Sequence, residues 1–278
     1  MARTFGIEIE GYNVPAAALA AAITAAGVRC HVQRYGHDVP TVWKVVTDAS
    51  VRGLNGFEVV SPILSGEAGL ATVRVVMDAI KNAGGKVNKT CGLHVHVGAD
   101  DLTVREFRNI AKNYLVFEDF FDVIMPVSRR ANNNQYIRSL RSRFGDYSHA
   151  SAARGMAALT DCATIDSVIE CVNGRRADSS SRYHKLNLTA FWRQRTIEFR
   201  QHSGTTDADK ACNWIVLLLA FVGKSAVSKP RPRAAGTLAI APSVLFTQFF
   251  LACGITDPAV RAHFTARRRA FADGTTEA

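Results

Sequence analysis

The sequence contains no closely spaced pair of cysteines. Its six cysteines are Cys30, Cys91, Cys162, Cys171, Cys212 and Cys253. None belongs to a C-x-x-C motif, which excludes a zinc knuckle and gives no sign of a disulfide framework. A reducing compartment, the cytoplasm, is therefore the expected location.

Long apolar runs and an apolar leader are also missing. The longest continuous apolar stretch, residues 214–222, is far shorter than the roughly 20 residues that span a bilayer. Near the N-terminus, Arg3, Glu8 and Glu10 stand where a secretory leader would have its apolar core. We therefore expect a soluble protein that is neither secreted nor bound to a membrane.

Acidic residues are fewer than basic ones. The chain has 24 Asp and Glu against 34 Lys and Arg, a formal net charge of +10. This excess favours an anionic partner, which could be a nucleotide, an acidic peptide or a nucleic acid. With 47% hydrophobic residues, the 278-residue chain can bury one sizeable core, so disorder is not expected to dominate.

Three short stretches each place two polar side chains two residues apart between apolar neighbours. The pairs are Glu8 with Glu10, His94 with His96, and Glu198 with Arg200. Because alternate residues of a strand point to opposite faces, each pair shares one face and its apolar neighbours line the other. If the three strands are neighbours, carboxylates, imidazoles and a guanidinium converge on one surface, as a metal-dependent phosphate site requires.

The order of the predicted elements is that of an α+β protein. Strands are predicted at 4–10, 28–35, 42–48, 57–60, the histidine stretch, and a hairpin at 183–190 and 195–202. Helices are predicted at 15–26, 66–83, 163–172 and 207–225, with a further long helix after a capping box at Thr103 and Glu106. We expect a curved, mostly antiparallel sheet with helices on its apolar side and an open polar side.

The predicted domain boundary lies near residue 225. Residues 1–225 form the expected main domain, and residues 226–278 the expected linker and small basic helical tail. Lys229 to Arg233 alternates basic residues with proline, which is typical of a linker, and the tail carries Arg267, Arg268 and Arg269.

Each feature also has a simpler interpretation. Glu8 with Glu10 alone fits a solvated strand face, and Glu198 with Arg200 alone fits a surface ion pair worth under about 1 kcal/mol. Residues 129–143 carry five arginines and no acid, which favours a solvated helix face and leaves a phosphate-binding loop possible.

Six motifs in order resemble a known family. They are G-x-E-x-E near residue 8, D-x-S at 48, F-E-V-V-S-P-x-L at 57, C-G-L-H-V-H-V at 91, L-N-L at 186, and T-I-E-F-R-x-H-S-G-T at 196. Over residues 5–220 the chain resembles the amidoligase branch of the carboxylate-amine ligases, related to glutamate-cysteine ligase and glutamine synthetase. The resemblance implies a glutamine synthetase-like catalytic fold.

The resemblance also implies a metal site. Glu8, His94 and Glu198 would hold one Mg²⁺ or Mn²⁺ ion. A second ion would be held by Glu10 and Glu58.

Further roles follow from the same resemblance. Arg200 would contact the phosphoryl group, and His96 would lie near the nucleotide phosphate. Asn187 matches a recurrent position and is expected to contact the nucleotide, and Arg182 and Lys185 are nearby basic candidates for the phosphates of ATP.

The residue types suit this chemistry independently of the resemblance. Joining a carboxylate to an amine in water is driven by forming an acyl phosphate from ATP, and hard divalent ions on carboxylate oxygens neutralise the phosphates involved. The amine must lose a proton, for which Asp48 and Glu58 are both candidates. The expected substrates are a small-molecule or peptide carboxylate and amine, whose identities the sequence does not specify.

Two other classes of protein are alternatives. A metal-dependent hydrolase could use His94 and His96, but Gly98 stands where the aspartate of an H-x-H-x-D-H motif would be. An inactive basic module could bind nucleic acid through residues 129–143 and 261–269, which lack interleaved aromatic residues. Nucleic acid is therefore not the expected partner.

Overall fold

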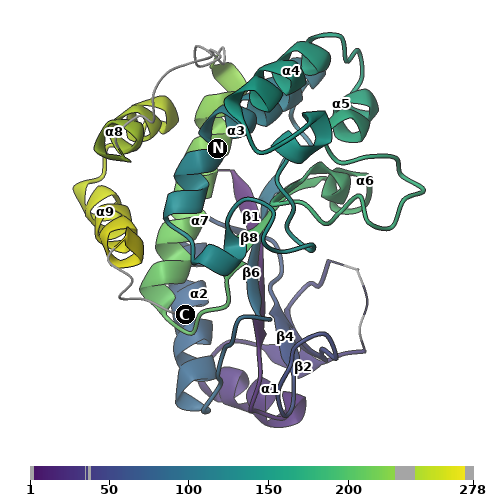
Figure 1. Cartoon of the computed structure of the whole chain (residues 1–278). Helices are drawn as coiled ribbons and strands as arrows, with labels where there is room; N and C mark the ends of the chain where they lie inside the picture. The colour runs from purple at the N-terminus through teal and green to yellow at the C-terminus, as the bar shows by residue number, and fades with distance from the viewer. Residues whose placement is uncertain (1–2, 35, 37–38, 229–241, 273–278) are drawn as a thin grey trace. The chain divides into compact units, whose positions relative to one another are not determined.

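The computed structural model describes residues 3–34, 36, 39–228 and 242–272 (Figure 1). The chain forms two compact units. The first unit comprises Met1–Gly98 and Phe199–Val216, and the second comprises Ala99–Glu198 and Leu217–Glu277. The boundary expected near residue 225 stays a prediction, and the expected linker at 229–233 lies outside the described residues.

Among the described residues, eight strands form one sheet in the order β2-β3-β4-β1-β6-β8-β7, with β5 paired to β1. The strands are β1 (Thr4–Gly11), β2 (Cys30–Val32), β3 (Trp43–Thr47), β4 (Phe57–Val60), β5 (Leu64–Ser65), β6 (Gly92–Gly98), β7 (Leu186–Asn187) and β8 (Thr196–Ser203). Strand β1 runs antiparallel to β4, β5 and β6, and only β2 with β3 is parallel among the pairings with a defined register. The predicted α+β fold with a mostly antiparallel sheet is confirmed.

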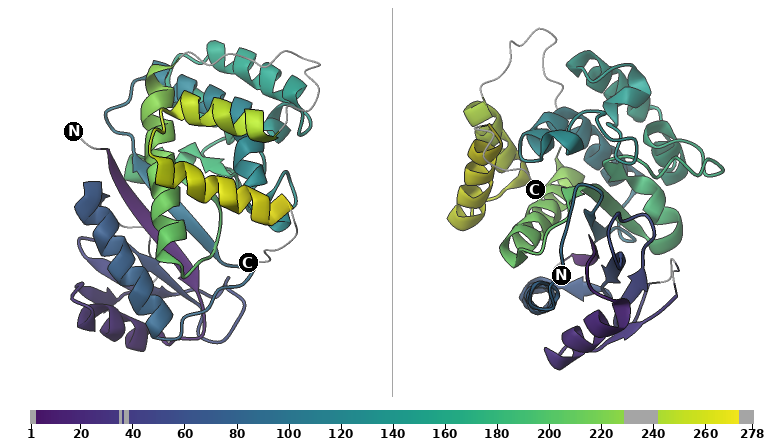
Figure 2. Two further views of the ribbon diagram at one scale, coloured as in Figure 1. Left: turned by 90° about the vertical axis from the view of Figure 1, so that its left-hand side faces the viewer. Right: turned by 60° about the horizontal axis from the view of Figure 1, so that its bottom comes forward.

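In the first unit, one face of the sheet is apolar. Phe5, Ile7 and Ile9 of β1 alternate with less buried residues and are almost completely buried. Helices α1 (Ala16–Ala25) and α2 (Gly66–Asn82) lie beside each other on one side of the strands (Figure 2). Burying a large aliphatic or aromatic side chain contributes about 1.5–3 kcal/mol, so the apolar half of the alternating pattern fixes which face carries the polar residues.

In the second unit, α3 (Val104–Val123) is the central helix. It begins at the predicted capping box, in which the Thr103 backbone N–H donates to Glu106 Oε2 at 2.8 Å. The other helices assigned in this unit or shared with the first are α4 (His149–Thr160), α5 (Ile165–Val172), α6 (Phe191–Gln194), α7 (Ala208–Val227), α8 (Pro242–Cys253) and α9 (Pro258–Ala272). Helix α4 was not predicted, because its short alanine-rich sequence has no strong apolar stripe.

The C-terminal helices pack onto α3. Phe249 of α8 stacks on Phe120 of α3 with ring centroids 3.6 Å apart, and both rings are completely buried. Arg267 of α9 donates from Nε to the Ile124 carbonyl at 2.7 Å, and Arg268 lies over the Phe246 ring. Two of the three consecutive arginines of the expected basic tail are therefore part of the packing of this unit.

The arginine-rich segment is not a helix face. Residues 127–129 and 141–144 form short 3-10 helices, and irregular backbone joins them. Arg129 and Arg141 are buried, and Arg138 donates from Nη2 to the Ser180 carbonyl at 2.9 Å. The prediction of a solvated helix face was wrong because Arg138 and Arg141 bind carbonyl and carboxylate groups that are distant in the chain, which local sequence does not show.

The two strands predicted as a hairpin at 183–190 and 195–202 are not joined by a tight turn. Its first arm is the two-residue strand β7, and a 3-10 turn and the short helix α6 separate it from β8. Arg195 has a positive φ of 56° just before β8 begins. The chain therefore reverses through a helical turn.

Helix α7 is the one described helix that is long and apolar enough to cross a membrane. It has 20 residues, of which an 18-residue stretch has a mean hydropathy of 1.4 and is 56% buried inside the protein. Core helices of soluble proteins pass the same test of length and composition.

Candidate functional site

The strand register brings five predicted site residues onto one face of the first unit. Glu8 of β1 faces His94 of β6, and Glu10 of β1 faces Glu58 of β4. His96 lies two residues beyond His94 on the same strand. Directly facing residues in a sheet share a face, so all five lie opposite the apolar face described above. For these strands the predicted shared polar face is confirmed.

Glu8 is the centre of this group. His94 Nδ1 lies 3.0 Å from Glu8 Oε2, and His96 Nε2 lies 3.4 Å from Glu8 Oε1. The second ring nitrogen of His94, Nε2, lies 3.7 Å from Glu10 Oε1. The His94 side chain is only 6% exposed and that of Glu8 20% exposed, so this face is more enclosed than a solvent-facing strand.

Glu58 completes a set of atoms that fits one cation. One ligand atom each from Glu8, Glu58 and His94 lies within 4.8 Å of the other two. Two atoms bound to one ion at about 2–2.6 Å can be at most about 5 Å apart. Two carboxylates and one imidazole are also ligand types that Mg²⁺ and Mn²⁺ accept, so these residues fit the ion that the family resemblance implies.

The pKa values of the carboxyl groups of Glu8 and Glu58 are shifted in opposite directions. Burial raises the pKa of Glu58 well above its ordinary value, and the negative charges of Glu8, Glu10 and Asp48 raise it further. Burial also acts to raise the pKa of Glu8, but hydrogen bonds and positive charge from His94 and His96 outweigh it and hold that pKa well below the ordinary value. Without a cation, Glu8 therefore ionises at a lower pH, and Glu58 at a higher pH, than an ordinary glutamate.

This difference predicts the pH dependence of metal binding. A cation must displace the proton of Glu58, so we expect Mn²⁺ affinity to rise with pH until that raised pKa is passed. In the metal-free protein the same raised pKa makes the ionisation of Glu58 lower the free energy of unfolding. The contribution of Glu58 to stability is fully present below the unfolded pKa of about 4.5 and is lost as pH rises through the folded pKa. Glu58→Gln should therefore raise metal-free stability at neutral pH and weaken Mn²⁺ binding.

Thermal melting and Mn²⁺ titration across pH 5–8 measure both effects. The reverse result, a Glu58→Gln protein that melts lower without metal and binds Mn²⁺ as tightly as wild type, would remove Glu58 from the site.

Gly92 lets the backbone approach this group. Its N–H donates to Glu10 Oε2 at 2.6 Å. A Cβ atom at this position would lie 2.7 Å from His94 Nε2. The glycine of the C-G-L-H-V-H-V motif therefore leaves the space that the His94 ring occupies.

Asp48 lies close to the same group, in the turn after β3. Its Oδ1 accepts hydrogen bonds from the Ser50 N–H at 2.8 Å and the Ser50 hydroxyl at 2.7 Å. Its charge contributes to the raised pKa of Glu58. The structure thus brings Asp48 near the predicted metal ligands, and its role as a base stays a prediction.

Lys44 is a further buried charge on this face. Val60 of β4 pairs with Lys44 of β3 on one side and with Glu8 of β1 on the other, so Lys44 and Glu8 lie on the same face. The Lys44 side chain is almost completely buried, and Nζ lies 3.2 Å from the Gly36 carbonyl. The alternation of residues 42–48 indicated its face, but nothing in the sequence gave it a function.

Glu198 and Asn187 meet in the second unit. Asn187 Nδ2 donates to Glu198 Oε2 at 2.5 Å, and both side chains are buried. Arg200 follows two residues later on β8, and strand alternation places it on the same side of that strand as Glu198. That Glu198 shares an ion with Glu8 and His94, and that Arg200 contacts a phosphoryl group, stay predictions.

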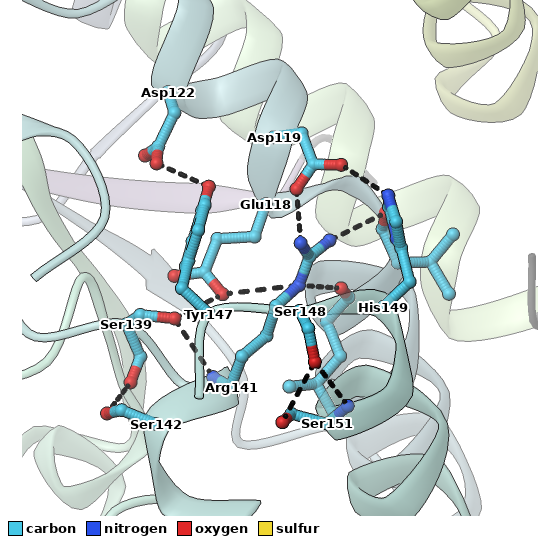
Figure 3. Close-up of polar contacts among 12 residues, drawn as sticks. Glu118, Asp119, Asp122, Ser139, Arg141, Ser142, Tyr147, Ser148, His149 and Ser151 are labelled. Carbon is cyan, nitrogen blue, oxygen red and sulfur yellow. Dashed lines mark hydrogen bonds and ion pairs between the residues drawn. The ribbon is translucent and has the colours of Figure 1, made fainter. Parts of the chain in front are cut away.

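Lys185 belongs to a buried ionic cluster on α3. Its Nζ lies 2.6 Å from Asp122 Oδ1 and 3.5 Å from Glu118 Oε1, and its side chain is completely buried. Arg141 pairs with Glu118 and Asp119 in the same cluster (Figure 3). The cluster joins the segment after residue 138 to α3.

Tyr147 and His149 extend this cluster. The Tyr147 hydroxyl donates to Asp122, and His149 Nε2 lies 3.2 Å from Asp119 Oδ2 (Figure 3). The other predicted cation, Arg182, is half-buried, and its guanidinium carbon lies 5.1 Å from the centroid of the Tyr183 ring. Nucleotide binding by Lys185 and Arg182 stays a prediction.

We expect Lys185→Met to lower the free energy of unfolding by about 3–5 kcal/mol, because it leaves two buried carboxylates without this ammonium. Arg182→Gln, which removes a cation from a half-buried position, should cost about 1 kcal/mol or less. Urea denaturation of both variants measures the difference. A Lys185→Met protein as stable as wild type would show that the ammonium is not needed for folding and would favour a role in ligand binding.

Comparison with known proteins adds three findings. A family model described as "Putative amidoligase enzyme" matches residues 1–222. A search of curated proteins found no match. Among the similar solved structures is one described as the crystal structure of a novel glutamine synthase homolog, 13% identical, with a TM-score of 0.43, covering 99% of this chain and 67% of the other.

Proposed function

The chain belongs to the amidoligase family, and from that premise we propose that it is an ATP-dependent ligase that joins a carboxylate to an amine through an acyl phosphate. The observation that carries the proposal is the single-face group of Glu8, Glu10, Glu58 and His94. Acidic ligands of this kind favour hard divalent ions, which accompany phosphoryl transfer. A zinc hydrolase more often uses three histidines or two histidines with one carboxylate.

Glu8, Glu58 and His94 would hold one Mg²⁺ or Mn²⁺ ion, and Glu10 lies beside them for a second. Family resemblance adds Glu198 to the first ion. When bound, such ions neutralise the β- and γ-phosphates of ATP and favour departure of ADP. His96, which contacts Glu8, would lie on the nucleotide side.

The proposed reaction has two steps. A substrate carboxylate oxygen attacks the γ-phosphorus of ATP, the bond to the β-phosphate oxygen breaks, and ADP leaves. The amine nitrogen then attacks the acyl carbon, inorganic phosphate leaves with the original carboxylate oxygen, and the nitrogen loses a proton. Arg200, with a planar two-pronged guanidinium, suits the equatorial oxygens of the phosphoryl group.

Asp48 suits the role of proton acceptor better than Glu58. Its carboxylate is held by Ser50 and stands beside the metal ligands. Glu58 is hydrogen-bonded to Glu8, and its raised pKa makes it lose its own proton less readily than an ordinary glutamate. Asp48 is therefore the residue that we assign to accept the proton or hold the incoming ammonium.

The test is product formation from ATP, Mg²⁺ and a mixed pool of carboxylates and amines. Mass spectrometry should find a product equal in mass to two pool members minus one water, together with ADP and phosphate. Production of ADP without any such condensation, in pools of amino acids, peptides and polyamines, would contradict amide formation. The six cysteines are free thiols, which fits the cytoplasm as the proposed location.

A further inference from the structure

A buried asparagine holds the two-residue strand β7 in place. Asn173 Nδ2 donates to the Leu186 carbonyl at 2.9 Å, and the Leu188 N–H donates to Asn173 Oδ1 at 2.9 Å. The Asn173 side chain is only 2% exposed. Its amide therefore binds the backbone on both sides of Asn187.

The Asn187 amide has a defined orientation. Its Oδ1 accepts hydrogen bonds from the Thr189 N–H at 2.9 Å and the Thr189 hydroxyl at 2.6 Å. The oxygen of the amide is thus assigned by the backbone donor, and the nitrogen must point the other way. That nitrogen donates to Glu198 Oε2 at 2.5 Å.

The surroundings make this orientation rigid. Asn173, Asn187 and Glu198 are all at least 95% buried. Lys185, which directly precedes Leu186 in the chain, pairs with Asp122 of α3. A hydrogen bond in the interior of a protein, where the effective dielectric constant is low, is stronger than one in water. The carboxylate of Glu198 is therefore held by Asn187. The strand that carries Asn187 is in turn held by Asn173, at the end of α5, and by the pairing of Lys185 with α3.

We propose that Asn187 is a positioning residue that orients the Glu198 carboxylate for a divalent cation, with Asn173 bracing the strand that carries it. This rests on the proposed function, in which Glu198 is a metal ligand. It gives Asn187 a different role from the nucleotide contact expected from sequence. Partners that orient metal ligands in other proteins contribute about 10–100-fold to metal affinity.

The test is Mn²⁺ affinity, read from the electron paramagnetic resonance signal of free Mn²⁺, in Asn187→Asp. The aspartate keeps an oxygen that can accept from Thr189 and replaces the amide donor by a second carboxylate oxygen. We expect Mn²⁺ to bind about 10–100-fold more weakly. Thr189→Val, which removes only the hydroxyl that donates to Asn187, is the matched control and should bind Mn²⁺ within about twofold of wild type.

A purely structural role in the turn gives a different pattern. Asn187→Asp would then change the melting temperature of the metal-free protein and leave Mn²⁺ affinity unchanged, which would overturn the proposal. If Asn187→Asp does not fold, Asn187→Ser removes the amide without adding charge and is judged by the same two outcomes.

Glu198→Gln separates this proposal from the proposed function. If Glu198→Gln weakens Mn²⁺ binding and the Asn187 variants do not, Glu198 is a ligand that needs no support from Asn187, and only the positioning role fails. If Glu198→Gln leaves Mn²⁺ affinity unchanged, Glu198 is not a ligand and both assignments fail.

Discussion

Arg200→Lys should lower turnover by roughly two to three orders of magnitude while leaving metal-free melting and Mn²⁺ binding nearly unchanged. This is the range typical for losing one preorganised donor to the transition state. Lysine keeps the positive charge but presents a single ammonium in place of a planar fork, so it cannot hold two phosphoryl oxygens at once. The loss should therefore appear in kcat more than in the affinity for ATP.

Arg195→Lys is the matched control for this variant. Arg195 precedes the same strand, its side chain is 62% exposed, and its nearest carboxylate, Asp100, is 3.8 Å away. An exposed pair of this kind contributes little, so turnover should stay close to wild type. If a confirmed ATP-dependent activity survives Arg200→Lys within about threefold, the phosphoryl contact lies elsewhere, and Arg182 becomes the next candidate.

Glu8→Gln should weaken Mn²⁺ binding by more than about 100-fold, beyond the range of residues that only support a metal ligand. Glu8 contacts both His94 and His96, and with Glu58 and His94 it makes up the three residues whose ligand atoms fit one ion. Glutamine has the same shape but no charge, and its nitrogen cannot coordinate a cation. The metal-induced rise in stability, about 2.7 kcal/mol for wild type at a hundredfold excess over Kd, should disappear.

Asp209→Asn controls for the loss of one negative charge. Asp209 lies in the first turn of α7, its side chain is 73% exposed, and it pairs with Arg74. Calorimetric titration of Mn²⁺ into both variants should show wild-type affinity for Asp209→Asn alone. Binding by Glu8→Gln within a few-fold of wild type would mean that the ion, if any, is held by other residues.

The parts of the fold that could be predicted from sequence are those set by local pattern. Alternation in β1 and β6 gave both the strands and the face that carries Glu8 and His94, because one residue of slip would expose every apolar side chain. The capping box at Thr103 placed the start of α3, because its two hydrogen bonds are formed within four residues.

The parts that could not be predicted depend on partners far apart in the chain. Arg141 and Lys185 are 44 positions apart, yet both pair with Glu118 in the interior. A run of arginines has the same local pattern whether it is solvated or buried against carboxylates. The support of Asn187 by Asn173 was missed for the same reason, because two isolated asparagines give no periodic signal.

The aromatic contacts between α8 and α3 show that the packed core extends beyond the residues matched by the family model. The match to the family model ends at residue 222, whereas the rings that cover Phe120 and Phe121 of α3 come from Phe246 and Phe249. A truncation chosen from the similarity alone would cut through a hydrophobic core and leave an apolar helix surface in water. Comparisons of activity among such proteins therefore need chains that retain these C-terminal helices, whether or not the helices take part in the chemistry.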